Sequence, residues 1–325
     1  MAQTDLHGIS QSKQEIESIM KREFGNSTVV VSFERMTKGM MNWVGHVKIN
    51  KKPCDVILKL SNQPGKWGIA KEYYVMELLR KKAKVPVPKV YAHDFSKKDY
   101  PYEYTIVSKL KGQCLEDIWA QLTESEQEQI AVEMGKMLAK INSIEFKQFG
   151  RIVGDGAIEN YDSYCDGLLG EELDNIYQQH IEAGFIPSET ALAVKTFLLS
   201  KRGILQKLDK PCLVHNDFHF WHIFVKKIKG KWKINGVIDF GFAEIAPKEC
   251  DFVKPDRFIF NKGENIKSKF MEGYSCILPF KPENEEIVRI LRVYYDFWFI
   301  YRLFKANNPE LATEYLRNIK ALMKA

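Results

Sequence analysis

LVHNDFHFWHIFVKKIKGKWKINGVIDF, residues Leu213 to Phe240, is the stretch of this sequence that is most informative about the fold. Its apolar and β-branched runs predict three short strands, around 213–214, 223–225 and 232–238. The first strand leads into a loop that carries Asp217, and the third strand ends at Asp239, which is followed by a flexible Gly. Phosphoryl transfer uses two such carboxylates, one that orients the incoming hydroxyl and one that holds the metal bridging the phosphates.

The elements before this stretch predict a small antiparallel sheet with one helix. Residues 28–36, 43–49 and 54–60 have the alternation of strands, and two more strands are expected at 89–94 and 104–109. Helical spacing predicts a short helix over 11–24 and another over 69–82, which the proline pair after residue 85 would stop.

Most of the rest of the chain has helical patterning. The predicted helices cover 115–121, 124–144, 158–182, 187–208, 284–305 and 309–323. The sequence therefore predicts an α+β protein with a sheet-rich N-terminal lobe over 1–107, a hinge at 108–112 and a larger helical lobe over 113–325.

The 213–240 stretch resembles the catalytic and metal loops of the aminoglycoside phosphotransferase family, which are relatives of the protein kinases. The family pattern His-Gly-Asp-Leu-His-x-x-Asn-Ile-Leu, followed by Ile-Asp-Trp/Phe, is matched at His215, Asp217, His219, Ile223 and Ile238-Asp239. The resemblance implies a protein-kinase-like bilobal fold, with Asp217 as the catalytic base and Asp239 as the metal ligand. It also implies that His215 supports the loop and that Asp251 braces it.

One position departs from that pattern. His222 stands where the family has an Asn that binds the second metal, and the macrolide phosphotransferase branch looks similar in carrying His there. Magnesium prefers oxygen ligands, whereas imidazole suits softer divalent ions. Three roles stay open for His222: a nitrogen ligand, a holder of metal-bound water, or a packed loop histidine.

The N-terminal lobe has its own matches to this family. Residues 37–42 resemble the Gly-Gly-x-x-Asn nucleotide loop, which gives Gly39 and Asn42 as nucleotide-binding residues. Lys59 ends the run Val-Ile-Leu-Lys, like the kinase lysine that grips the α- and β-phosphates. Glu72 matches the family's partner for that lysine, with Glu77 as the rival on the same helix. Ser108, at the start of the hinge, is the remaining nucleotide-binding candidate.

The stretch between Arg151 and Lys195 contains no Lys or Arg but nine carboxylates, in a chain whose formal net charge is +6. The nine are Asp155, Glu159, Asp162, Asp166, Glu171, Glu172, Asp174, Glu182 and Glu189. In the family this insert helps to wall the acceptor pocket, and a carboxylate-lined cleft would attract a cation. The alternative is that these are the solvated faces of amphipathic helices.

The composition excludes several classes of protein. Lysines 226, 227, 229, 231 and 233 read as a solvated hairpin, and no basic run is dense enough for nucleic acid. No apolar run approaches the roughly 20 residues of a membrane span. Six scattered cysteines without a CxxC pair, many of them flanked by apolar residues, indicate buried free thiols in a reducing compartment. We expect a cytoplasmic protein with no obligatory protein partner.

The resemblance, together with the acidic insert, implies an enzyme that uses ATP or GTP with Mg²⁺ to phosphorylate a hydroxyl of a small, cationic molecule such as an aminoglycoside or a macrolide. A metabolic kinase of the choline, sugar amine or homoserine type is the first alternative. A kinase-like binding module without catalysis is the second, and the presence of Lys59, Asp217 and Asp239 together argues against it. A protein kinase is disfavoured, because no Ala-Pro-Glu element follows Asp239.

Overall fold

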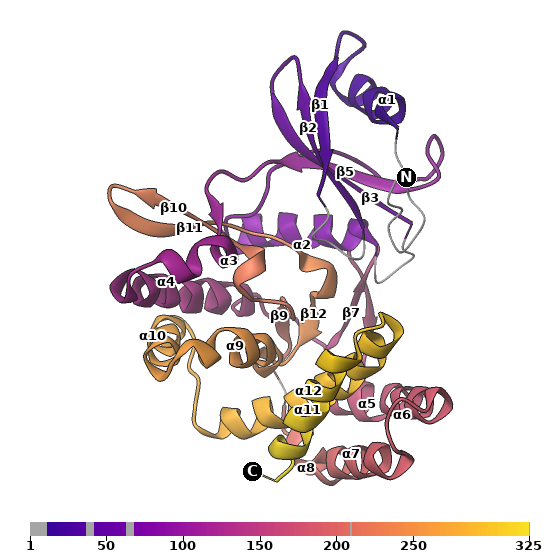
Figure 1. The fold of residues 1–325 in the computed structure, drawn as a ribbon, viewed down its shortest axis with the longest axis vertical. Coiled ribbons are helices and arrows are strands. Elements are labelled where there is room, and N and C mark those ends of the chain that lie inside the picture. Colours follow the sequence, from indigo (N-terminus) through magenta and orange to yellow (C-terminus); the bar gives the residue numbers. More distant parts are fainter. Residues whose placement is uncertain (1–11, 37–41, 63–67, 209, 325) are drawn as a thin grey trace. The chain divides into compact units, whose positions relative to one another are not determined.

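The computed structural model describes residues 12–36, 42–62, 68–208 and 210–324, which form two compact units (Figure 1). Unit 1 consists of the described residues of Met1–Ile130 with Ile152–Ile158 and Phe220–Ala243. Unit 2 consists of Ala131–Arg151, Glu159–His219 and the described residues of Glu244–Ala325. The hinge expected at 108–112 stays a prediction, and each unit is described by itself below.

Unit 1 is built on a five-stranded antiparallel sheet with the strand order β1-β2-β3-β5-β4. Its strands are β1 (Val30–Arg35), β2 (Trp43–Ile49), β3 (Asp55–Ser61), β4 (Val90–Asp94) and β5 (Glu103–Ser108). The helices of this region are α1 (Lys13–Phe24) and α2 (Ile69–Lys82). The expected meander of three strands and the helix over 69–82 are therefore confirmed.

One face of this sheet is closed by α1. A capping box between Ser12 and Glu15 starts the helix, because each side chain satisfies a backbone N–H of the other residue. Ile16, Ile19 and Met20 have no solvent exposure and pack in one core with apolar side chains of β1, β2, β3 and β5. This burial fixes the sheet that carries Lys59 on β3.

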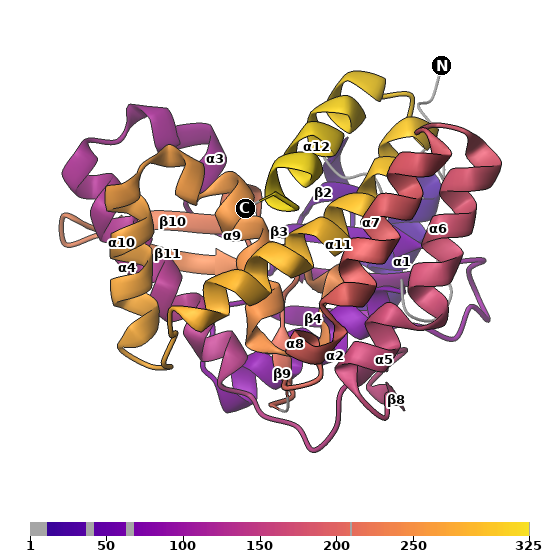
Figure 2. The same cartoon turned by 90° about the horizontal axis from the view of Figure 1, so that it is seen from below.

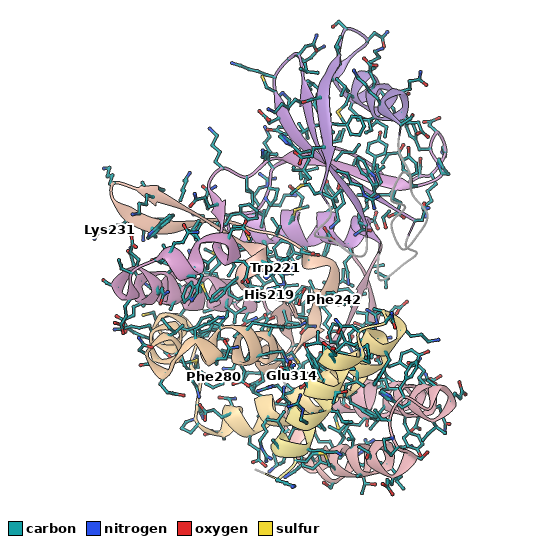
Figure 3. All side chains as sticks on the ribbon, viewed as in Figure 1. His219, Trp221, Lys231, Phe242, Phe280 and Glu314 are labelled. Atoms are coloured by element: carbon teal, nitrogen blue, oxygen red, sulfur yellow. The ribbon has the colours of Figure 1, made fainter. Side chains whose placement is uncertain are left out.

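The second sheet of unit 1 has three strands in the order β11-β10-β6. Its strands are β6 (Gln113–Cys114), β10 (Ile223–Ile228) and β11 (Lys231–Val237), near α3 (Leu115–Ile118) and the 3₁₀ turns η2 (Trp119–Gln121) and η3 (Phe220–His222). Lys229 (φ 50°) and Gly230 (φ 79°) join β10 to β11, and positive φ at both positions is typical of a tight hairpin turn. Lys231 lies at this exposed end of the hairpin (Figure 3), which confirms the hairpin expected from the lysine-rich sequence.

Three elements contain residues of both units. They are α4 (Glu124–Asn142), β7 (Gly150–Val153) and β8 (Ala157–Asn160). A reciprocal pair of contacts between Thr123 and Glu126 caps α4 at the position expected from the sequence.

Unit 2 is mainly helical. Its helices are α5 (Tyr164–Leu169), α6 (Glu171–Ala183), α7 (Ser188–Ser200), α8 (Arg202–Leu205), α9 (Val253–Phe258), α10 (Glu264–Ser275), α11 (Glu283–Lys305) and α12 (Pro309–Leu322). Its short strands β9 (Cys212–Val214) and β12 (Glu244–Ala246) pair antiparallel, and Ile245 also pairs with Gly150. The 3₁₀ segments are η5 (Lys248–Phe252) and η6 (Phe260–Lys262), while η4 (Phe240–Phe242) belongs to unit 1.

The long helix α11 is the centre of the unit 2 core, with α6, α7 and α12 beside it (Figure 2). Its buried residues include Ile290, Leu291, Val293, Phe297 and Ile300, all with no solvent exposure. None of the described helices combines the length and the apolarity that a membrane span requires.

The single helix predicted over 158–182 is wrong. The structure has β8 there, then α5 and α6 separated at Gly170. Ser163 caps α5 through a 3.0 Å bond from Asp166 N, and a Cβ on Gly170 would lie 2.5 Å from Asp166 O. The chain therefore turns at a residue that carries no side chain, a local conformation that helical periodicity does not report. The helix predicted over 187–208 is also divided, into α7 and α8, with the break at Lys201.

All six cysteines are free thiols, as expected from their spacing. Cys165, Cys212 and Cys250 are buried. Cys54 and Cys276 are exposed, so burial is the rule for only part of the set.

Candidate active site

Lys59 and Glu72 form a buried ion pair inside unit 1. Lys59 Nζ lies 2.5 Å from Glu72 Oε1 and 2.7 Å from Oε2. Burial alone would lower the pKa of Lys59, but the charges of Glu72 and Asp239 outweigh it and raise the pKa. The ammonium group is therefore held in its charged form, as a phosphate-binding lysine requires.

The structure also decides between the two candidate partners of this lysine. Glu77 pairs with Arg80 at 2.7 Å and with Lys81 at 3.4 Å on its own helix. Residues 72 and 77 point about 140° apart around α2, because a helix turns about 100° per residue. Glu72, in the first turn, faces β3, whereas Glu77 faces away from it.

Asp239 lies beside this pair. It follows β11 in a left-handed conformation (φ 66°, ψ 66°) and begins η4. A Cβ on Gly241 would lie 3.4 Å from both Asp239 Oδ1 and Glu72 Oε1, so these two carboxylates flank the same glycine. The side chain of Asp239 is 44% exposed, which leaves it accessible to a ligand.

His222 is placed next to Asp239 by the pairing of β10 with β11. Ile238 N donates to His222 O at 3.0 Å, and His222 Nε2 lies 3.5 Å from Asp239 Oδ2. One carboxylate and one imidazole nitrogen at this separation suit a divalent cation, so the donor set of this chain fits a metal. The geometry brings His222 and Asp239 together, while the metal-binding role of each stays a prediction.

The other three candidates for nucleotide binding, Gly39, Asn42 and Ser108, differ in their surroundings. Gly39 lies outside the described residues. Asn42 precedes β2, and within the described part of the chain its Oδ1 is buried without a hydrogen-bond partner. Ser108 ends β5, and its Oγ accepts from Lys89 N at 2.9 Å. Their roles in nucleotide binding stay predictions.

The loop after β9 carries Asp217 in unit 2. Its side chain is only 13% exposed, and its Oδ1 lies 3.6 Å from His219 Nε2 and 3.0 Å from Lys254 Nζ. His219 can be located in Figure 3. His215 is fully buried, and its Nδ1 accepts a hydrogen bond from Asp217 N at 3.3 Å. His215 thus contacts the backbone of the candidate base directly, and its supporting role stays a prediction.

Asp251 accepts three hydrogen bonds at the base of the same loop. His215 N (2.9 Å) and Asn142 Nδ2 (2.7 Å) donate to Oδ2. Asn216 N (2.7 Å) donates to Oδ1, and Asn216 itself has a positive φ of 60°. Burial raises the pKa of Asp251 to about 6, although the hydrogen bonds counteract the rise.

Two residues in this network were not singled out by the sequence analysis. Asn142, at the end of α4, donates to Asp251 and to Leu213 O, and it accepts from Tyr274 OH at 3.0 Å. The sequence signal that could have pointed to Asn142 is a polar residue at the end of an otherwise apolar, buried helix face. Lys254, the partner of Asp217, follows Asp251 by three residues, and no motif pointed to it.

The acidic insert is less negative than its sequence implied. Asp166 pairs with Arg202 at 2.7 Å, Asp174 pairs with Lys195 at 2.7 Å, and Glu172 pairs with Arg151. The basic partners lie at the edges of the insert or beyond it. Three of the nine carboxylates are therefore compensated within unit 2.

A family model described as APH, phosphotransferase enzyme family, matches residues 43–255. The chain belongs to this family. The match spans the described Lys59–Glu72 pair, Asp217, Asp239 and Asp251.

Solved structures of other proteins share the fold of this chain. A thermostable mutant of aminoglycoside phosphotransferase APH(4)-Ia in a ternary complex with ADP and hygromycin B has a TM-score of 0.71 at 16% identity, over 95% of this chain and 98% of that one. A candidate fructosamine-3-kinase from Thermobifida fusca has a TM-score of 0.69 at 12% identity, over 97% and 100%. The protein-kinase-like α+β fold expected from the sequence is thus confirmed.

This chain is also similar in sequence to a curated protein, a subtelomeric hrmA-associated cluster protein of Aspergillus fumigatus. The two are 30% identical over 90 residues, which is 27% of this chain. The match covers only 18% of the length of that relative.

Proposed function

We propose that this protein is a nucleotide-dependent O-phosphotransferase that moves the γ-phosphate of ATP or GTP to a hydroxyl of a small molecule. The observation that carries the proposal is the buried Lys59–Glu72 pair with Asp239 beside it. A largely buried ammonium paired with a buried carboxylate is costly to maintain without a ligand, and a cationic group beside an accessible, metal-binding carboxylate is what polyphosphates require.

Four candidate site residues of unit 1 would have distinct roles in binding the nucleotide and the metal. The Lys59 ammonium would hold oxygens of the α- and β-phosphates, with Glu72 fixing its direction. Asp239 and His222 would hold a divalent metal, with Mg²⁺ as the proposed ion. Such a metal would supply positive charge to offset the negative charge that develops on the phosphate oxygens.

Asp217 would act on the acceptor. Its carboxylate would orient the acceptor hydroxyl and take up its proton while the oxygen bonds to the γ-phosphorus. The bond from that phosphorus to the β–γ bridging oxygen breaks, and the nucleoside diphosphate leaves. The three hydrogen bonds to Asp251 and the contact from His215 would keep the loop in place for this step.

For the acceptor we propose a small hydroxylated cation, such as an aminoglycoside or a macrolide. Support comes from the insert over 152–194, where six of the nine carboxylates are outside the three ion pairs described above. Two aminoglycoside phosphotransferases of similar structure have been solved with hygromycin B and with kanamycin bound. The second candidate is a metabolic kinase for a sugar amine, which the similarity to fructosamine-3-kinase structures favours. A cytoplasmic location, where ATP and GTP are abundant, fits either acceptor.

The deciding experiment is a nucleotide-consumption screen with Mg²⁺ and either ATP or GTP. The acceptors to be compared are aminoglycosides, macrolides, sugar amines, choline and homoserine. Asp217→Asn serves as the inactive reference, since loss of a general base typically reduces turnover by about 10²–10⁴-fold. Acceptor-dependent turnover that Asp217→Asn abolishes supports the proposal, whereas a wild-type protein that consumes no nucleotide with any of them contradicts it.

Salt dependence then tests the charge of the acceptor. A cation captured by several carboxylates should show a KM that rises with salt, since the Debye length is about 8 Å at physiological ionic strength. Individual exposed pairs contribute roughly 0–1 kcal/mol, so no single carboxylate should dominate. A KM that ignores salt would favour a neutral or anionic acceptor.

A further inference from the structure

The sequence offered no role for Lys254 of unit 2, although its Nζ lies 3.0 Å from Oδ1 of Asp217. It is the second residue of α9 and is 27% exposed. His219 approaches the same oxygen at 3.6 Å. One oxygen of the candidate base is thus approached by a lysine side chain and by a histidine.

The backbone explains why Lys254 reaches this place. Asp251 binds the N–H groups of His215 and Asn216, so the segment that leads into α9 is tied to the Asp217 loop. Lys254 follows Asp251 by three residues, or about one helical turn. The contacts that brace the loop therefore also deliver the ammonium group to it.

Aromatic side chains fix the direction of the lysine. Its Nζ lies 5.7 Å from the ring centre of Phe258, on the same helix, and 5.4 Å from that of Phe299, on α11. Both distances are within the range of cation–π attraction, about 6 Å. A surface lysine has many rotamers, but one held between two rings and a carboxylate has few.

We propose that Lys254 is a positioning residue for phosphoryl transfer, which keeps Asp217 ionised and aimed at the acceptor hydroxyl. The inference rests on the function proposed above, because it assigns Asp217 the role of base. An opposite charge at hydrogen-bond distance stabilises a carboxylate in its ionised form. The ion pair also restricts rotation of the carboxylate, so that one orientation is available when the hydroxyl arrives.

The test compares Lys254→Met, Lys254→Arg and the control Lys267→Met. Lys267 is a matched control, since it is 31% exposed and forms an ion pair of the same 3.0 Å length, with Glu285. Turnover is measured as phosphate release from ATP and GTP with Mg²⁺ and water as the acceptor, together with the nucleotide KM and the melting temperature.

We expect Lys254→Met to lower kcat by about 10- to 100-fold, below the loss for Asp217→Asn, since Lys254 acts only through Asp217. The nucleotide KM should stay within about two-fold, because this lysine is not assigned to the nucleotide. Lys254→Arg should restore most of the rate, and Lys267→Met should behave as the wild type. In the Asp217→Asn background, Lys254→Met should cause little further loss.

A wild-type kcat in Lys254→Met, or an undiminished loss in the Asp217→Asn background, would overturn the inference and leave the proposed function standing. A lower melting temperature with no rescue by arginine would also overturn it, because that is the result of a purely structural role. A wild-type protein that consumes no nucleotide, with or without an acceptor, would instead overturn the proposed function and this inference with it.

Discussion

Replacing Asp251 with Ala should damage the protein in two separable ways, and the structure allows both to be estimated. The substitution removes the acceptor of three N–H groups: those of His215 N and Asn216 N, and one of the two on Asn142 Nδ2, whose other N–H still donates to Leu213 O. A buried donor without a partner costs about 1–3 kcal/mol, so three cost about 6 kcal/mol at the middle of the range.

Part of this cost is offset. The pKa of Asp251 is raised from 3.8 to about 6, so at pH 7.5 its ionised form disfavours the folded state. The rise of about two units corresponds to roughly 3 kcal/mol, at 1.36 kcal/mol per unit. The net loss is therefore about 3 kcal/mol, or roughly 6–12 °C in melting temperature, at 2–4 °C per kcal/mol for a domain of this size.

The effect on activity should be larger than this loss of stability predicts. Asn216 holds a positive φ while its N–H is bound to Asp251, and it directly precedes Asp217. Without that bond the loop can relax to a more common backbone conformation. We expect kcat at 20 °C, where the variant stays folded, to fall at least ten-fold with an unchanged nucleotide KM.

Glu249→Ala is the matched control. Glu249 is also buried, lies in the same 3₁₀ segment, and has a pKa raised by burial, but it accepts from Asn284 on α11 rather than from the loop. The Glu249→Ala variant should be less stable than the wild type but should keep the wild-type kcat. If Asp251→Ala and Glu249→Ala had the same kcat, the bracing of the catalytic loop by Asp251 would be refuted.

Three further outcomes are expected. Burial raises the pKa of both Asp251 and Asp296 to about 6, so between about pH 4 and 6 the folded chain holds protons that the unfolded chain has lost. Their contribution to the free energy of unfolding therefore falls as pH rises through that window. Asp251→Ala should reduce this slope in a plot of melting temperature against pH, because one of the raised carboxyl groups is removed, and an unchanged slope would contradict the assignment. Lys59→Ala should weaken nucleotide binding in a titration with a fluorescent ATP analogue, because the phosphates lose their buried cation. Glu77→Gln, on the same helix as the partner of Lys59, should bind normally, and equal weakening in both variants would argue against the buried pair as the phosphate site. His222→Asn should keep substantial Mg²⁺-dependent turnover, since it supplies an oxygen ligand, whereas His222→Ala should lose much more. Near-native turnover in both would mean that the histidine is only packed beside Asp239.

The sequence by itself determined the elements that lie along one continuous stretch of chain. The helix over 69–82, the antiparallel strands before it and the hairpin of β10 and β11 were all predicted, because their periodicity and turn residues are local signals. The candidate chemistry was local too, since Asp217, His222 and Asp239 are separated by at most 22 residues. Where a local break in the backbone decided the structure, as at Gly170, periodicity failed.

The tertiary structure alone decided which side chains meet across elements. Sequence left Glu72 and Glu77 as rivals for Lys59, and the rotation of α2 against β3 selected Glu72. It gave no sign that Lys254 meets Asp217, or that three carboxylates of the acidic insert are paired. Contacts of this kind depend on how one helix or strand is rotated and shifted against another, which apolar packing over the whole unit sets and no short stretch of sequence encodes.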